Sequence, residues 1–294
     1  MNQHYVSQFY LRKWDIGESY VYVMQTEKTH PEYSKILKKS IRHVCSQENI
    51  YEPEYKCIPI ATEQTINGIQ LELPLKSGVF EKEFGKTESV TGKAIDHVLK
   101  VTTRDNLRNA LICRKSDKDN IAKYMTMQVL RHPSLLETNI KNGEELLYKE
   151  MEDCKQRLYG FNSEVQEKLL HACHDTCLFN VVFGLTPYYT EKIIIEKVFC
   201  FYLGKQFITT ETPVLLSETC SGVIPNIWFP LSPTVGLYLC DKGGKVSREH
   251  IGNRLAQCSD EIQYVLNRTT ISFAASNNMR IIGSNKRLIS NLWK

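Results

Sequence analysis

The stretch from residue 79 to residue 98, VFEKEFGKTESVTGKAIDHV, decides how the middle of the chain folds. Its apolar and small side chains recur at spacings of three and four, which places them on one face of an α-helix. The residues on that face are Phe80, Phe84, Thr87, Thr91, Ala94 and Val98. Further helical patterns follow it, so the sequence predicts a helical segment over about residues 79–178.

Signals for the starts and ends of helices continue through this segment. Ser116 stands just before an apolar run and is followed by acidic residues, which is typical of a helix N-terminus. That helix is expected to run to His132, where Pro133 interrupts it. Ser163 and Gln166 form a capping box for a last helix that reaches about residue 178.

The regions on either side of the helical segment are rich in β-branched and aromatic residues, which is typical of strands. We expect strands at residues 20–26, 193–202, 207–210, 227–229 and 235–240. A final long helix is expected to begin at Ser247 and to pass Leu255 and Leu266, and the tail is expected to carry one strand and a short helix. This order favours an α+β fold with a mixed or antiparallel sheet over βαβ alternation. No shift in composition marks a linker, so we predict one domain over residues 1–294.

The bulk composition is that of a folded protein with no strong electrostatic bias. Hydrophobic residues make up 42% and charged residues 24% of the chain, which excludes wholesale disorder. A net charge of +4 permits a polyanionic partner such as RNA but does not demand one. The basic residues at 38, 39, 42, 114, 115, 118 and 123 are most simply a solvated surface, although they would suit nucleic acid if they converged with Arg12 and Arg131.

The cysteines and the hydropathy pattern bear on the compartment. Ten cysteines are spread mostly singly through predicted helices and strands, which is unlike a disulfide scaffold. The first residues lack the basic and apolar segments of a signal peptide, and no apolar run is as long as a membrane span. We therefore expect a cytoplasmic protein with reduced thiols that does not enter a membrane.

The segment from His171 to Cys177 offers a possible metal site, because His171, Cys173, His174 and Cys177 lie close together in the sequence. A structural zinc site needs about four such ligands, and this spacing is not that of the common cysteine pairs. A helix with buried thiols is the simpler interpretation. The chain also has no Walker loop, no dinucleotide fingerprint and no zinc-protease motif, so we expect neither a metal nor a cofactor.

Four segments of the chain occur together in a characteristic order. They are HYVSQFYLR at residues 4–12, VCSQENIY at 44–51, QVLRHP at 128–133 and FITTETPV at 207–214, followed by FPLSP at 229–233 and a late Asn267. In this order they resemble a large bacterial family classed as a domain of unknown function, number four-two-three-eight, whose members open with HYVPQFYL. Ser7 stands where that family usually has proline, and TET at 210–212 stands where it usually has SDN. The resemblance implies no activity, so the functional residues must be argued from their chemistry.

His4 is the first catalytic candidate. Histidine titrates near neutral pH, so His4 could act as a general base or acid. On a helix, Gln8 and Arg12 would share its face and could bind substrate. The alternative is a structural histidine whose ring nitrogen bonds a backbone carbonyl.

Arg131 is the second candidate. Arginine is the side chain best suited to hold a phosphate or a carboxylate through two contacts. Gln128 lies three residues before it on the same predicted helix and could contact the same substrate. The alternative, which we weigh equally, is that Arg131 ties a helix end to a carboxylate such as Glu81 or Glu88.

Glu211 and Asn267 complete the candidate site. Glu211 ends a β-rich run, where a carboxylate could serve as the catalytic acid or orient His4. Asn267, in the late helix, could orient a phosphate or a partner histidine. For both residues we favour the structural alternative, which is a hydrogen bond to the backbone.

Two functional hypotheses follow. The first is a metal-independent, RNA-directed nuclease that acts as an effector or toxin in phage defence, with His4, Arg131 and Glu211 as its catalytic residues. The second is a non-enzymatic sensor or adaptor that binds a small ligand or a partner protein, with the aromatic N-terminus and Trp228–Phe229–Pro230 lining the binding surface. Convergence of His4, Arg131 and Glu211 on one cleft would favour the first.

Overall fold

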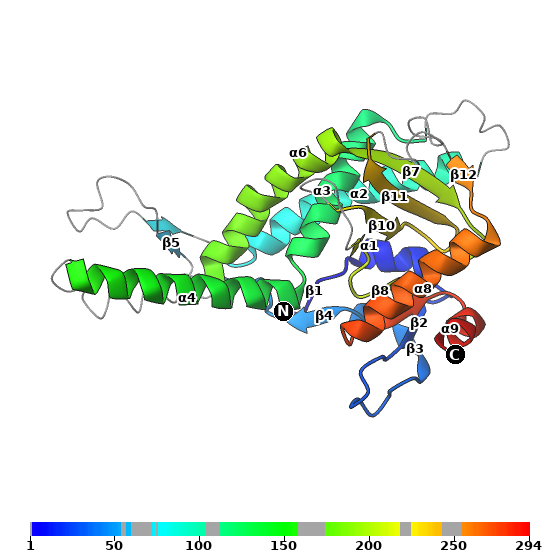
Figure 1. Cartoon of the computed structure of the whole chain (residues 1–294), viewed down its shortest axis with the longest axis horizontal. Helices are drawn as coiled ribbons and strands as arrows, with labels where there is room; N and C mark the ends of the chain where they lie inside the picture. Colours follow the sequence, from blue (N-terminus) through cyan, green and yellow to red (C-terminus); the bar gives the residue numbers. More distant parts are fainter. Residues whose placement is uncertain are drawn as a thin grey trace.

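The computed structural model of the chain describes residues 2–53, 57–59, 72–74, 76–103, 112–157, 174–217, 225–242 and 255–294. It has the α+β fold that the sequence predicts, with long helices beside a mixed five-stranded sheet (Figure 1). Among the described residues, no helix is both long and apolar enough to cross a membrane.

The helix predicted from the spacing of apolar residues after residue 79 is confirmed. Helix α2 spans Val79–Thr102 and buries all six residues that its spacing selects. Helix α3 spans Lys115–Leu130 and packs against α2. Its N-cap is Arg114, two residues before the predicted cap Ser116, because Asp117 accepts a hydrogen bond from the backbone nitrogen of Arg114 at 3.1 Å and caps the helix there.

Pro133 separates α3 from α4, as expected. Helix α4 spans Pro133–Arg157, with the proline at its first position, where no backbone donor is needed. It extends away from the rest of the described structure (Figure 1). The capping box at Ser163 and Gln166 lies outside the described residues.

The strand predicted at residues 193–202 is half wrong. A short π-helical segment, η4 (Asn180–Leu185), leads into helix α6 (Thr186–Glu196), and strand β7 begins only at Lys197 and ends at Leu203. Ile193 is buried on α6, and α6 packs along α3. Burial against a neighbouring helix therefore outweighs the β-propensity of the isoleucine run.

The final helix was also predicted to begin too early. Leu255–Gln257 form strand β12, which pairs in parallel with β7, and helix α8 spans Asp260–Ser276. Ser259 caps α8, since its Oγ accepts the backbone hydrogen of Ile262 at 3.2 Å. Ser247 lies outside the described residues. Leu255–Gln257 pair with Phe201–Leu203 of β7, a contact between distant segments that helical periodicity does not register.

The five-stranded sheet has the order β12-β7-β11-β10-β9, in which only the β12–β7 pair is parallel. Its remaining strands are β9 (Leu215–Leu216), β10 (Ile227–Pro230) and β11 (Val235–Asp241). One face of the sheet turns Phe199, Phe201, Leu237 and Leu239 into the main core, where each is at most 3% exposed. The helices α2 and α3 contribute to the same core.

The four-stranded sheet is antiparallel and has the order β3-β2-β13-β8. Its strands are β2 (Tyr20–Met24), β3 (Ile36–Ser40), β8 (Thr209–Thr210) and β13 (Ile281–Gly283), so it joins both ends of the chain. Helix α9 (Lys286–Trp293) packs against β13 and β3. Two further strand pairs are β1 (Asn2–His4) with β4 (Ser46–Glu48) and β5 (Cys57–Pro59) with β6 (Glu72–Pro74).

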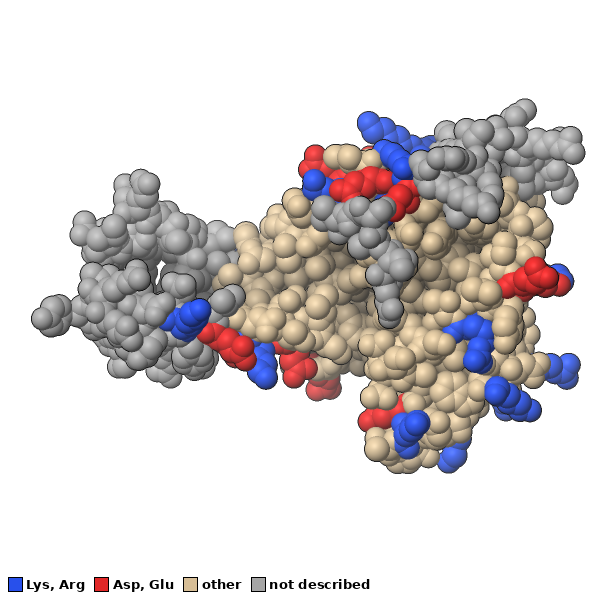
Figure 2. Space-filling view, viewed as in Figure 1, with Lys and Arg blue, Asp and Glu red and all other residues tan. Residues whose placement is uncertain are grey.

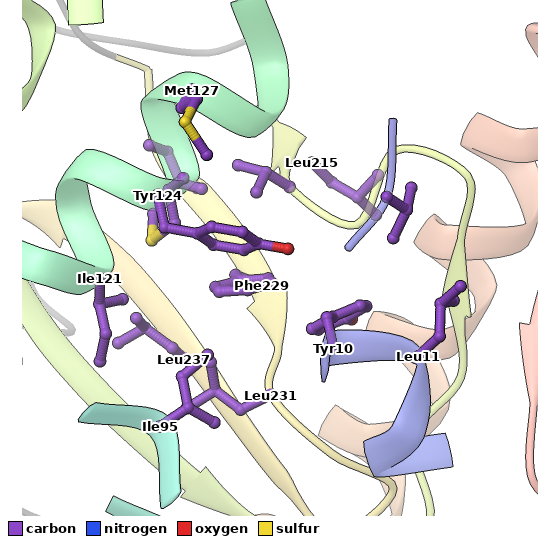
Figure 3. Packing of buried hydrophobic residues seen from close by; sticks show 14 of the residues in the cluster. Tyr10, Leu11, Ile95, Ile121, Tyr124, Met127, Leu215, Phe229, Leu231 and Leu237 are labelled. Carbon is purple, nitrogen blue, oxygen red and sulfur yellow. The ribbon is translucent and has the colours of Figure 1, made fainter. Parts of the chain in front are cut away.

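The N-terminal segment passes through the interior of the molecule. The segment forms helix α1 (Gln8–Leu11). The short helices η1 (Arg12–Trp14) and η2 (Ile41–His43) both contact α1. The ring of Tyr10 stacks on Phe229 of β10 at 5.4 Å, and Tyr124 of α3 lies on the other side of Phe229 at 6.1 Å (Figure 3). The N-terminal segment therefore packs against strand β10 of the five-stranded sheet.

Candidate functional site

A polar cavity of about 390 Å³ lies between the β2–β3 hairpin and the adjoining ends of β8 and β13. Glu211 directly follows β8, and Arg280 directly precedes β13. The lining residues are Val23, Gln25, Glu27, His30, Glu32, Lys35, Leu37, Lys39, Glu211, Asn278 and Arg280. Of the sequence-predicted site residues, Glu211 alone lines this cavity.

The pairing of β8 with β13 brings Glu211 and Arg280 together. Thr210 lies opposite Ile281 in this antiparallel pair, so Glu211, which follows Thr210, falls opposite Arg280, which precedes Ile281. The backbone nitrogen of Arg280 donates to Oε2 of Glu211 at 2.8 Å, and Nε of Arg280 donates to Oε1 at 2.7 Å. A carboxylate held by a backbone donor and a guanidinium has a fixed orientation at the cavity wall.

Tyr5 completes this cluster from the N-terminal segment. Its hydroxyl donates to Oε1 of Glu211 at 2.6 Å and accepts a hydrogen bond from Nη2 of Arg280 at 3.1 Å. Burial and the nearby charge of Glu211 raise the pKa of Tyr5, so its phenol stays protonated. Burial tends to lower the pKa of Arg280, but the charge of Glu211, its hydrogen bond to the guanidinium and the neighbouring Tyr5 act together, and the pKa is raised. The cluster therefore keeps a charged guanidinium and a neutral phenol at neutral pH.

The neighbours of this cluster are less suited to chemistry. Cys45 adopts a left-handed backbone conformation with φ of 56°, and its carbonyl accepts the backbone hydrogen of Tyr5 at 3.0 Å. Burial raises the pKa of the Cys45 thiol well above its ordinary value, which disfavours a nucleophilic thiolate. The ring of His132 meets Tyr5 edge-on at 5.5 Å, and burial lowers the His132 pKa.

The hairpin contributes His30, Lys35 and Lys39 to the cavity. Nδ1 of His30 accepts the backbone hydrogen of Glu32 at 3.0 Å, so the neutral ring carries its proton on Nε2. Lys39 pairs with Glu32 at 3.1 Å. No carboxylate among the described residues forms an ion pair with Lys35. Lys35 and the Nε2–H of His30 are therefore open to a ligand.

His4 lies apart from this cavity. Its Nε2 is 3.3 Å from the carbonyl oxygen of Ile41, and the side-chain nitrogen of Gln8 is 3.4 Å from the same ring. Burial lowers the His4 pKa, which favours the neutral ring at neutral pH. Arg12 is exposed at the end of α1. The bond to a backbone carbonyl is the contact expected of a structural histidine.

Arg131 is enclosed in a separate network and is 1% exposed. Its Nη2 donates to Ser7 and to Gln128, each at 2.9 Å, and pairs with Glu88 at 2.7 Å. Burial tends to lower the Arg131 pKa, but the charge and hydrogen bond of Glu88, together with Tyr51 and Tyr124, raise it. Glu88 is one of the two carboxylates, Glu81 and Glu88, that the structural alternative for Arg131 predicts as its partner.

Gln128 and Asn267 bond the backbone. The side-chain nitrogen of Gln128 donates to the carbonyl of Tyr5, which ties α3 to the N-terminal segment. Asn267 is 1% exposed, accepts the backbone hydrogen of Ile208 at 3.1 Å and donates to the carbonyl of Gln206 at 3.0 Å. The structure thus brings His4 beside Gln8, and Arg131 beside Gln128, while Glu211 and Asn267 each belong to other networks.

The cavity-lining residues with free or charged donors that the sequence did not indicate are Arg280, His30 and Lys35. Nothing in the sequence marks Arg280 as the partner of Glu211, because 69 positions separate them and the pairing depends on strand register. Tyr5 does lie in the opening motif, and a polar aromatic residue next to His4 is the one feature of the sequence that could have drawn attention to it. The hairpin residues carry no motif at all.

The structure describes only part of the metal candidate, since His171 and Cys173 lie outside the described residues. Nδ1 of His174 is 3.1 Å from Oδ1 of Asp175. Within the described parts of the chain, no group of three or more His, Cys, Asp and Glu side chains is arranged to hold a metal ion.

Comparison with family models identifies one match. The model described as "Protein of unknown function (DUF4238)" matches residues 2–179, which is more than half of the chain. The chain therefore belongs to the DUF4238 family, in agreement with its sequence motifs. Neither curated proteins nor solved structures give a match.

Proposed function

We propose that this DUF4238 protein is a binding protein, a sensor or adaptor, whose polar cavity takes a small ligand with a negatively charged group such as a phosphate ester. The observation that carries the proposal is that Arg280, Lys35 and His30 all line this cavity, Arg280 from the end of β13 and the other two from the hairpin. A volume of about 390 Å³ lies within the range of small-ligand sites.

The charges that line the cavity balance, and Lys35 and Glu27 are the cation and the carboxylate left outside the ion pairs of the described residues. Three carboxylates and three cationic side chains line it. Glu211 is already paired with Arg280, and Glu32 with Lys39. Lys35 retains its charge for a ligand, and the ring of His30 adds a neutral donor.

The one face drawn in Figure 2 offers less support for a long nucleic-acid strand than for a small ligand. On the face in Figure 2, the Lys and Arg side chains at the lower right stand apart, with uncharged surface between them. Extended binding to a phosphate backbone would instead require a continuous basic stripe.

RNA-directed nuclease activity is the second candidate, because Glu211, His30 and Arg280 line the same cavity. Glu211 would remove the 2′-hydroxyl proton, His30 would protonate the leaving oxygen through Nε2 after taking up a second ring proton at Nδ1, and the guanidinium would stabilise the phosphorane. In this version His30 and Arg280 take the roles first considered for His4 and Arg131. An effector or toxin in phage defence would act through such cleavage.

The decisive measurement is calorimetric titration of the protein with ribose 5-phosphate and with neutral ribose. We expect the phosphate ester alone to bind. Lys35→Ala should weaken its binding roughly 10- to 100-fold, since a hydrogen bond to a charged group contributes about 1.5–3 kcal/mol. The matched control is Lys205→Ala, because Lys205 is an exposed lysine outside the cavity that pairs with Asp260. Equal binding by Lys35→Ala and the wild type would contradict the proposal.

The nuclease candidate has its own test. Wild-type protein should cleave a short RNA in the presence of a chelator, and His30→Ala and Glu211→Gln should not, while thermal melts establish that both variants are folded. Overexpression should slow bacterial growth only if cleavage occurs. Uncleaved RNA with intact phosphate binding leaves the binding protein as the function.

A further inference from the structure

A second cavity of about 200 Å³ adjoins the first and has a different chemistry. Glu27 and Asn278 line both cavities, so these two residues stand at their common boundary. The second cavity lies between the β2–β3 connection and the ends of α8 and α9, where Tyr33 and Trp293 form part of its wall.

Tyr33 and Trp293 form an aromatic corner. Their ring centroids are 6.2 Å apart and the rings are nearly perpendicular, at 75°. Both side chains remain partly exposed. A flat aromatic group that enters this corner would lie on one ring and meet the other with its edge, which is a favourable arrangement for aromatic pairs. A nucleobase is such a group, and every base has a face that can stack.

The boundary residue Glu27 has unused hydrogen-bonding capacity. Its carboxylate accepts hydrogen bonds from Oγ1 of Thr29 at 3.0 Å and from the side-chain nitrogen of Gln25 at 3.5 Å. A carboxylate offers about four acceptor positions, so about two remain for a ligand. Oε1 of Gln25 is also buried and accepts no hydrogen bond from the described residues. Hydroxyl groups are the donors that would satisfy both.

We propose that the two cavities together form one site for a ribonucleoside 5′-phosphate. The base stacks in the corner of Tyr33 and Trp293, the ribose hydroxyls bond Glu27, and the phosphate meets Lys35, His30 and Arg280. The order of these groups along the two cavities is the order of base, sugar and phosphate in a nucleotide. This inference rests on the proposed function and adds the ligand class to it.

The ribose contact predicts discrimination between ribonucleotides and deoxyribonucleotides. A 2′-deoxy ligand leaves one of the available acceptor positions at the boundary without its donor. A site that bonds a ligand hydroxyl rejects the analogue that lacks it, because its own polar groups are then unpaired. A ribonucleotide should therefore bind more tightly than its 2′-deoxy counterpart.

The test titrates the protein with the four ribonucleoside 5′-monophosphates, their 2′-deoxy forms, the free nucleosides and ribose 5-phosphate. At least one ribonucleotide should bind roughly 5- to 150-fold more tightly than ribose 5-phosphate, which is the range for stacking of one base. Tryptophan fluorescence gives a second readout. Trp14 and Trp228 are at most 4% exposed, so quenching by a nucleotide reports on Trp293.

The variant Trp293→Leu keeps apolar bulk but removes the aromatic face. It should lose the quenching and the advantage of the nucleotide over ribose 5-phosphate, while it keeps its affinity for ribose 5-phosphate. Tyr33→Leu should give the same loss of affinity and serves if Trp293→Leu does not fold. The control is Tyr264→Leu, since Tyr264 is an aromatic residue of α8 that is 57% exposed and lies outside both cavities.

The possible outcomes distinguish failure of the nucleotide assignment from failure of the proposed binding of phosphate esters. If ribose 5-phosphate binds as tightly as every nucleotide, and Lys35→Ala weakens both, the phosphate site stands and the nucleotide assignment is wrong. If the free nucleosides bind as tightly as the nucleotides, the phosphate contact is wrong and the site is reassigned to a neutral ligand. If no phosphate ester binds, both proposals fall.

Discussion

The variant Arg131→Met tests whether Arg131 serves stability or ligand binding. The guanidinium is 1% exposed, donates to Ser7 and Gln128 and pairs with Glu88. Its removal leaves the buried Oε1 of Gln128 without this donor and Glu88 without its cation. Breaking a buried ion pair costs about 3–5 kcal/mol. The side chain of Glu88 is 25% exposed and can be partly hydrated, so we expect the lower end, about 3 kcal/mol.

Urea denaturation followed by circular dichroism measures this loss. A change of about 3 kcal/mol should lower the melting temperature by roughly 6–12 °C in a chain of this size. The control is Arg12→Met, which makes the same substitution at an exposed residue of the N-terminal segment and should change stability by less than about 0.5 kcal/mol. If Arg131→Met melts within 2 °C of the wild type (about 1 kcal/mol or less) but no longer binds phosphate esters, the structural role is refuted and Arg131 belongs to the binding site.

Three further predictions concern other parts of the structure. Tyr10→Phe should cost about 1–3 kcal/mol, because the Tyr10 hydroxyl bonds the carbonyl of Pro230 at 2.6 Å in the core, whereas Tyr264→Phe on the surface should be neutral; equal melts would contradict it. Burial lowers the His132 pKa below its ordinary value near 6.5, so the unfolded chain binds more protons and the stability of the wild type should fall as the pH drops below about 6.5. His132→Phe should flatten that part of the curve of unfolding free energy against pH, and parallel curves for the two proteins would contradict the prediction. Cys200 and Cys240 have sulfurs 3.6 Å apart but lie diagonally across β7 and β11, where a disulfide would require the backbone to move; thiol counting in denaturant should therefore recover all ten cysteines, and a count near eight would indicate a disulfide.

Local patterns in the sequence predict the elements that local forces determine. The helix face of Phe80, Phe84 and Val98 is buried in α2 as its spacing indicates. The strands at 227–230 and 235–241 also agree closely with their β-rich sequences. In contrast, Ile193 is helical and Leu255 is in a strand, because the packing of α6 on α3 and the pairing of β12 with β7 are contacts between distant segments. The spacing of apolar residues along the sequence does not predict such contacts.

The candidate site shows the same division. Glu211 could be selected from the sequence because a carboxylate ends a strand pattern. Arg280 could not, since its place beside Glu211 depends on the register of β13 against β8. The burial of Arg131 and its choice of Glu88 over Glu81 likewise depend on how α3 sits against α2. Residue chemistry thus predicts which side chains are capable of a function, and long-range pairing decides which of them meet.

The path of the N-terminal segment through the interior has a consequence for biosynthesis. Tyr5 and Arg280, which share a hydrogen bond, are separated by 275 positions in the chain. At elongation rates of about 5–20 residues per second, a ribosome needs roughly 15–55 s between the two. During that interval the first residues emerge without the strands that later enclose Tyr10 and Trp14. Contacts of such high sequence separation also slow folding after release. The opening motif is therefore synthesised well before the strands that enclose it, and its burial must wait for them.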